Sequence, residues 1–143
     1  MTTTVVSEAN IRKNTFKTIY EFISTYKSST WNLMSAFPMR TSDLPVIIIN
    51  PASIRYENVS YDGSARTNYI TILIEFYDLA KNGKNSVDSE KDKIADAFYS
   101  HMADFHLNRG LIFRHIEDEE SDEMLEGGNK INYGGFRAYF YLN

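Results

Sequence analysis

The sequence contains no cysteine, and that absence excludes a disulfide framework, a thiolate nucleophile, Cys-ligated zinc and iron–sulfur chemistry. Long apolar segments are also missing: the longest purely aliphatic run, Val46 to Ile49, is far shorter than the roughly 20 residues of a membrane-spanning helix. The N-terminal residues show neither the basic nor the apolar region of a signal peptide. We therefore expect a soluble intracellular protein with no membrane association.

Basic residues are outnumbered by acidic ones, 15 against 19, and the net charge of −4 argues against a protein held to nucleic acid by general positive charge. The acidity is concentrated in one ten-residue stretch that has no Lys or Arg. Its seven acids are Glu117, Asp118, Glu119, Glu120, Asp122, Glu123 and Glu126. Outside this stretch the 15 basic residues exceed the acidic ones, so the body of the protein is slightly basic.

The length of 143 residues fits one ordinary domain, and we expect a single domain over residues 1–143. Apolar residues at three- and four-residue steps predict two amphipathic helices, and alternating or continuous apolar runs predict strands. The helices are expected from Ser7 to Lys27 and, capped by Ser86 or Asp88, up to Phe105. The strands are expected at Val46–Ile49, Ser53–Tyr61, Tyr69–Leu79, Leu111–Ile116 and Lys130–Leu142.

Two amphipathic helices can cover only one face of a sheet, so the order α-β-β-β-α-β-β predicts an α+β two-layer sandwich. We expect a mostly antiparallel sheet of four to five strands with both helices on one face. The second face would then carry Tyr69, Leu73, Glu75, Tyr77, Arg137, Tyr139 and Tyr141. An exposed aromatic surface of this kind usually binds another protein. The alternative is that loops or the N-terminal segment cover it.

The sequence shows no pattern typical of an enzyme. His101 and His106 are separated by about 500° of helical rotation, so one helix cannot easily present both to one metal ion. There is no His-Glu-x-x-His, no phosphate-binding glycine loop and no Gly-x-Ser-x-Gly. Asp88, Glu90 and Asp92, with Lys91 and Lys93, could in principle hold Mg²⁺, but mixed charge on an amphipathic helix is typical of its solvent-facing side. We expect no catalytic residue, no metal and no cofactor.

The acidic stretch is interpreted as a loop between two strands, and two functions remain open for it. It could be a solvated, mobile connection, because like charges repel one another and resist packing. Alternatively, copies of the loop arranged around an axis would line a hole through which nucleic acid passes without sticking.

The layout resembles one family of viral proteins. An N-terminal helix, a short strand between Pro45 and Pro51, the long strand Tyr69-Ile70-Thr71-Ile72-Leu73-Ile74-Glu75-Phe76-Tyr77-Asp78, the helix from Ser89 to Phe105 and two closing strands follow one another. This order is similar to that of the tail-terminator (tail-completion) proteins of long-tailed bacteriophages and related viruses. The resemblance spans nearly the whole chain and is one of layout, without a short diagnostic motif.

The resemblance implies a non-enzymatic virion component at the junction of tail and neck, assembled in the host cytoplasm. Members of this family form a ring, usually hexameric, that caps the tail tube, ends its polymerisation and docks to the head–neck connector. The expected partners are therefore further copies of the chain, the tail tube protein and the connector, while DNA passes through the lumen without sequence-specific binding. The acidic loop would either line this lumen or form a docking edge for a partner. Another neck or tail adaptor, a head–tail joining protein, has a related architecture, and a host-type protein-binding module is a further alternative.

Overall fold

The computed structural model describes residues 8–35, 40–58, 66–108 and 110–142. Within these residues the chain forms three α-helices, two short 3-10 turns and a mixed sheet of six strands, so it is an α+β protein. In chain order the elements are α1 (Glu8–Tyr26), β1 (Asn32–Met34), η1 (Thr41–Asp43), β2 (Val46–Ile49), β3 (Ser53–Asn58), β4 (Arg66–Leu79), η2 (Ala80–Asn82), α2 (Lys84–Ser100), α3 (Met102–Asn108), β5 (Ile112–Glu126) and β6 (Asn129–Leu142).

The long strand β4 lies at the centre of the sheet. The strand order is β1-β2-β4-β6-β5. β3 pairs with the same edge of β4 as β2 does, nearer the N-terminal end of β4. β1 and β2 run parallel, and the remaining pairs are antiparallel. The expected count of four to five strands was therefore too low. The strand that the sequence did not reveal, β1, has only three residues, which is too short for a pattern of alternation to be recognised.

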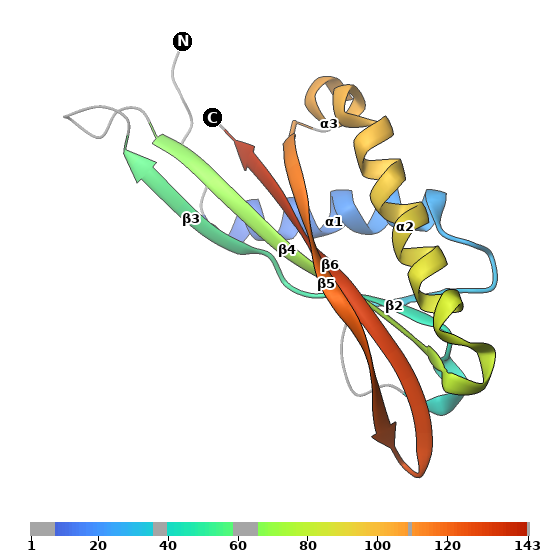
Figure 1. The fold of residues 1–143 in the computed structure, drawn as a ribbon. Coiled ribbons are helices and arrows are strands. Elements are labelled where there is room, and N and C mark those ends of the chain that lie inside the picture. The colour runs from blue at the N-terminus through green and yellow to red at the C-terminus, as the bar shows by residue number, and fades with distance from the viewer. Residues whose placement is uncertain (1–7, 36–39, 59–65, 109, 143) are drawn as a thin grey trace.

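The three helices lie on one side of the sheet (Figure 1), against the core face of β4. Ile70, Ile72, Ile74 and Phe76 form that face, and each has 0% exposure, as the alternation of apolar residues predicted. Phe22 of α1 and Phe98 of α2 pack against each other above these strands with their rings tilted, at a centroid distance of 4.9 Å. Burial of each such side chain contributes about 1.5–3 kcal/mol.

The first helix follows the prediction closely, since its apolar stripe packs into the core and it ends at Tyr26. Its expected N-cap, Ser7, lies outside the described residues. Trp31 follows the helix and is 5% exposed, with its ring edge-on to Phe76. The indole therefore closes the end of the helix against the core.

The second helix differs from the prediction at both ends. It begins at Lys84, after Gly83 at φ +87°, and not at a Ser86 or Asp88 cap. The Ser86 hydroxyl instead donates to the buried carboxylate of Asp78, 2.5 Å away, which fastens the first turn of α2 to the end of β4. The helix also stops at His101, whose φ and ψ of −117° and 26° leave helical geometry, so the expected single helix is divided into α2 and α3.

The acidic stretch is a strand and not a loop, which corrects the expectation for Glu117 to Glu126. β5 continues through all of it and pairs with β6 up to Glu126 and Asn129. The actual turn is Gly127-Gly128, and both glycines have positive φ, 57° and 82°, as a tight two-residue hairpin requires. The β5–β6 hairpin extends past the helices at one end of the molecule (Figure 1).

Candidate interaction surface

The strand register brings the predicted face residues together. On the face of the sheet opposite the helices, Tyr69 lies beside Tyr141 and Leu73 beside Arg137, while Thr71 lies beside Tyr139. We call this side the open face, defined by the odd-numbered residues of β4 and β6. All seven residues that the sequence assigned to it, including Glu75 and Tyr77, do lie on it. Their role in binding remains a prediction.

One half of the open face is covered by the chain itself. Val46, Ile48, Tyr77 and Ile131 are buried there in a second apolar cluster, against which Leu44 and Met34 pack from the segments before β2. Tyr77 is 5% exposed and donates its hydroxyl to Glu75, which also accepts from the side-chain amide of Asn50. Burial, followed by the hydrogen bond to Glu75, raises the pKa of Tyr77. The alternative that a loop covers the face therefore holds for this half, and Tyr77 belongs to the core.

The other half carries half-buried aromatic rings and charged side chains. Tyr69, Leu73, Tyr139 and Tyr141 are partly exposed there. The guanidinium groups of Arg55 and Arg114 lie 5.0 and 5.4 Å from the centre of the Tyr69 ring, within cation–π range. Aromatic side chains and arginines are the residue types that are enriched at protein–protein interfaces.

A polar network joins β5 to β6 in the middle of the open face. The Tyr139 hydroxyl donates to Glu117, 2.8 Å away, and the His115 ring stacks on the Tyr139 ring with centroids 4.6 Å apart. Arg137 forms an ion pair with Glu119. The hydrogen bond from Tyr139 lowers the pKa of Glu117, with a smaller effect from His115, and the same bond raises the pKa of Tyr139. The charges in the middle of the face are thus largely satisfied within the chain.

The seven acidic residues are divided between the two sides of the hairpin. Pairing with odd-numbered residues of β6 places Glu117, Glu119, Asp122 and Glu126 on the open face. Glu123 is opposite Asn132 and therefore lies on the helix side, and Asp118 and Glu120 face α2. The bulge between Glu119 and Asp122 adds one residue to β5 only, so beyond it the even-numbered residues Asp122 and Glu126 lie on the open face.

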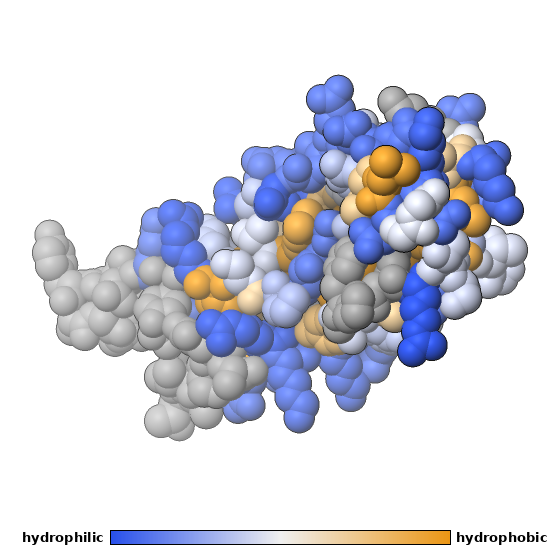
Figure 2. All heavy atoms as spheres, turned by 90° about the horizontal axis from the view of Figure 1, so that it is seen from below, coloured by the Kyte–Doolittle hydropathy of each residue, from blue (hydrophilic) through white to orange (hydrophobic). Residues whose placement is uncertain are grey.

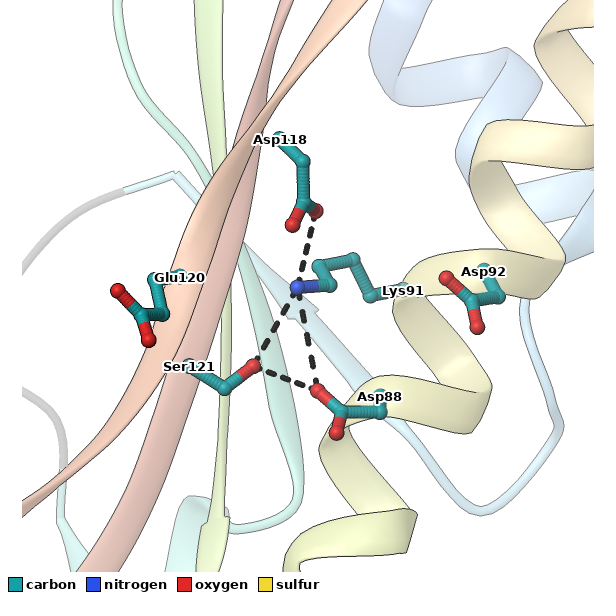
Figure 3. A pocket seen from close by; sticks show the side chains of 6 residues that line it. All are labelled: Asp88, Lys91, Asp92, Asp118, Glu120 and Ser121. Atoms are coloured by element: carbon teal, nitrogen blue, oxygen red, sulfur yellow. Dashed lines mark hydrogen bonds and ion pairs between the residues drawn. The ribbon is translucent and has the colours of Figure 1, made fainter.

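A cavity of about 540 Å³ separates the hairpin from α2, lined by Asp88, Lys91, Asp92, Asp118, Glu120 and Ser121 (Figure 3). Lys91 points into it from the helix. Its side chain is 6% exposed, and its ammonium lies 2.9 Å from the Asp118 carboxylate, 3.3 Å from the Ser121 hydroxyl and 3.2 Å from the Glu119 carbonyl. Ser121 in turn donates to Asp88. The cluster fastens the hairpin to the body.

The expectation that the charged residues of α2 face solvent was wrong for two of them. Lys91 and Glu90 are 5% and 4% exposed, and Glu90 accepts hydrogen bonds at 2.7 Å from both the backbone amide and the hydroxyl of Ser28. The sequence did contain a signal for Lys91. It follows Val87 by four residues and precedes Ile94 by three, so it lies on the apolar stripe of the helix.

Side chains of α2 also protect the free edge of β5. The Ile116 amide donates to the Tyr99 hydroxyl at 2.9 Å, and the Glu119 carbonyl is the one that Lys91 contacts. Both backbone groups belong to an edge strand, which would otherwise present them to another chain. Strand addition at this part of the edge is therefore blocked.

The histidines that the structure describes have structural contacts. His101 bonds the Tyr26 hydroxyl through Nε2 at 2.9 Å and the Ala97 carbonyl through Nδ1 at 2.8 Å, which links α1 to α2. His115 stacks on Tyr139, and the side chain of His106 lies outside the described part. No group of three or more His, Asp or Glu side chains among the described residues is arranged to hold a metal ion.

Seen from below, the molecule presents a mostly hydrophilic face on which apolar residues appear in separate patches (Figure 2). The large apolar side chains exposed among the described residues are Tyr99, Met102 and Leu125. None of the described helices combines the length and hydropathy of a membrane span. No protein-family model matches this chain, and no curated protein matches it at a significant level.

Proposed function

We propose that this chain is a structural virion protein of the tail-terminator type. Its copies form a ring, hexameric as the resemblance implies, that caps the tail tube, ends polymerisation and docks to the head–neck connector at the tail–neck junction. DNA passes through the lumen, and the protein is not an enzyme. In this proposal the fold is a two-layer sandwich with the helices in one layer. Part of the second face of the sheet is then left for a neighbouring subunit.

One observation carries this proposal: the open face is covered by its own chain in one half and exposes a mixture of rings and arginines in the other. Tyr77 is buried in the apolar cluster against which Leu44 packs, whereas Tyr69, Tyr139 and Tyr141 remain partly exposed. A chain that has packed half of a sheet face and left the other half amphipathic is suited to association. The acidic residues of the hairpin support the second part of the proposal, because negative charge disfavours the sticking of DNA.

The test is light scattering combined with negative-stain imaging, on the protein alone and with polymerised tail tube. We expect rings, or caps at tube ends. A monodisperse monomer that neither forms rings nor caps tubes would contradict the proposal, and enzymatic turnover of a small molecule at the cavity beside Lys91 would favour a different function.

Variants locate the interface. Leu73→Asp together with Tyr141→Asp places charge in the exposed half of the open face and should abolish association while leaving the circular dichroism spectrum unchanged. Met102→Asp is the matched control, because Met102 is 42% exposed and lies on α3, in the other layer. Equal assembly by both variants would mean that the open face is not the interface.

A further inference from the structure

Three strands of the described sheet, β1, β3 and β5, have one side without a partner strand. Two of them are unsuited to pairing with a further strand of the same kind. β1 has three residues. On β5 the Ile116 amide and the Glu119 carbonyl are occupied by Tyr99 and Lys91. Beyond the bulge, β5 is rich in carboxylates, and like charges placed opposite one another destabilise strand pairing.

The third of these strands, β3, is regular along its whole length. All six residues from Ser53 to Asn58 pair with β4 in one unbroken register. Figure 1 shows β3 at the side of the sheet away from the β5–β6 hairpin. An edge strand of this kind presents amide and carbonyl groups to which another strand can add. Its side chains then decide which strand fits.

The charged residues of β3 are one basic and one acidic side chain, two positions apart. Arg55 and Glu57 lie opposite Tyr69 and Thr67 of β4, so both are on the open face, and both are exposed. The residue between them is Tyr56. If two copies of β3 pair antiparallel with Tyr56 opposite Tyr56, each Arg55 lies directly opposite Glu57 of the second copy. Directly opposite residues have Cβ atoms about 4.5–5.5 Å apart, so both ion pairs can form.

We propose that β3 pairs with β3 of a second copy of this chain, antiparallel about a two-fold axis that passes between the two Tyr56 backbones. In this register Ile54 lies opposite Asn58, so the paired segment stays within β3. The same patch is used by both subunits, which makes the contact isologous and closes it after two copies. The pair hides the backbone edge of each subunit from other strands.

This inference goes beyond the proposed function and does not depend on it. The contact lies at an edge of the sheet, so it leaves the open face of both copies uncovered. A two-fold contact makes a dimer and does not by itself make a ring. The edge pair and the ring contact can therefore be measured separately.

The position of Arg55 in the single chain is compatible with the ion pair. Its guanidinium lies 5.0 Å from the centre of the Tyr69 ring, on the strand that borders β3 on its inner side. A guanidinium has five N–H donors, and contact with the face of a ring leaves donors for a carboxylate. Glu57 of the second copy would approach Arg55 from the outer side of β3.

The backbone supplies most of the contact, and the charges select the register. An exposed ion pair strengthens association by no more than about fivefold. A five-residue strand pair is a small interface, so we expect a dissociation constant of about 10⁻⁴ M. Two unlike pairs favour this register, whereas like charges in the same places oppose it.

Charge reversal tests the register. The background is Leu73→Asp with Tyr141→Asp, in which ring association through the open face is expected to be lost. Arg55→Glu makes both edge charges acidic and Glu57→Arg makes both basic, so each should weaken the dimer about tenfold in sedimentation equilibrium. Both substitutions in one chain again place unlike charges across the axis. This double variant should dimerise to within about threefold of the background chain.

Matched controls separate the edge from general charge. Lys81→Glu makes the same change of charge as Arg55→Glu at an exposed site of η2, after the C-terminal end of β4. Glu123→Arg matches Glu57→Arg on the helix side of the hairpin. Both should leave dimerisation unchanged. Amide hydrogen exchange on the background chain needs no change in β3: exchange from Ile54 to Asn58 should be slower at about 1 mM than at about 10 µM.

Every outcome bears on the edge pair. A background chain that stays monomeric at about 1 mM, ten times the expected dissociation constant, overturns the inference. Weakening by both single variants without recovery in the double variant overturns the register, and equal weakening by the controls does the same. If Arg55→Glu fails to fold by circular dichroism, the exchange measurement decides. A native chain that caps tubes while its edge does not pair leaves the proposed function standing. Edge dimers without rings or caps contradict the proposed function alone.

Discussion

Ser121 occupies the space that Gly134 leaves by having no side chain: a Cβ at Gly134 would lie 2.5 Å from the Ser121 hydroxyl oxygen. This closeness lets Ser121, at the bulge of β5, reach across to Asp88 and Lys91 on α2. The adjacent Gly135 is constrained differently, because its Cβ would lie 2.6 Å from the backbone carbonyl of Ile74. Two consecutive glycines in β6 thus allow the bulged hairpin to contact the body.

Gly134→Ala should destabilise the fold by about 1–3 kcal/mol, because the added methyl group must displace Ser121 from its hydrogen bonds. Urea unfolding would measure the loss. Combining it with Ser121→Ala should cost less than the sum of the two single changes, and strict additivity would refute the steric relationship. Gly135→Ala should cost more and should not be relieved by Ser121→Ala, since its obstacle is backbone.

Lys91→Met should remove the fastening of the hairpin while keeping the buried aliphatic stem. We expect a loss of about 1–2 kcal/mol, at the low end for a buried ion pair, because the Asp118 side chain is 67% exposed and remains hydrated. Amide hydrogen exchange should accelerate in β5 around Ser121. Lys93→Met is the control: Lys93 is exposed, and a cost below about 0.5 kcal/mol is expected. Similar losses for both lysines would contradict the assignment.

Tyr99→Phe should expose the Ile116 amide at the free edge of β5. The lost hydrogen bond should cost about 0.5–1.5 kcal/mol, and the Ile116 amide should exchange faster with solvent. Tyr20→Phe removes a hydroxyl that donates to the Leu33 carbonyl far from this edge, so it should leave Ile116 unaffected. Unchanged exchange in Tyr99→Phe would show that the hydroxyl does not protect the edge.

Tyr139→Phe should raise the pKa of Glu117 toward its ordinary value of 4.5, because the hydrogen bond that stabilises the carboxylate is removed. In the native chain the folded-state pKa of Glu117 is the lower one. Its contribution to stability is therefore present above the unfolded pKa and is lost as the pH falls through the folded one. Carboxyl NMR titration measures the shift, and Tyr141→Phe should leave the pKa of Glu117 unchanged.

The reverse change tests the same bond from its other side. Glu117→Gln should lower the pKa of Tyr139 toward its ordinary value of 10.0. The raised pKa of Tyr139 contributes stability that is present below the unfolded pKa and is lost as the pH rises through the folded value. Tyrosine ring NMR in the alkaline range follows this titration, and an unaltered Tyr139 pKa in Glu117→Gln would contradict the bond.

The parts of the fold that sequence predicted are those whose apolar pattern follows one period. The stripe of α1 and the alternation from Ile70 to Phe76 both give one continuous buried surface, and the structure confirms them. β5 was missed beyond Ile116 because charged residues are depleted in strands and show no apolar alternation. Its pairing depends on the backbone of β6, which follows the turn, and on the turn glycines Gly127 and Gly128.

The open face was predictable and its covering was not. Alternation alone placed Tyr69, Tyr77 and Tyr139 on one side, but Tyr77 is buried in an apolar cluster against which Leu44 and Met34 pack. Those two residues come from segments with no periodicity of their own. The burial of Lys91 was missed because the charge of its side chain outweighed its position on the apolar stripe. Only the exposed carboxylate of Asp118 across the cavity makes that position favourable.

The two-residue turn at Gly127-Gly128 also restricts how the length of the hairpin can change. A single inserted or deleted residue in β5 would move every acidic side chain beyond it to the other side of the sheet, unless a second bulge compensates. Changes of two residues in each strand would preserve which side each residue faces. Longer or shorter versions of this arm, natural or designed, should therefore differ from it by whole pairs, which makes hairpin length a stepwise property of the protein.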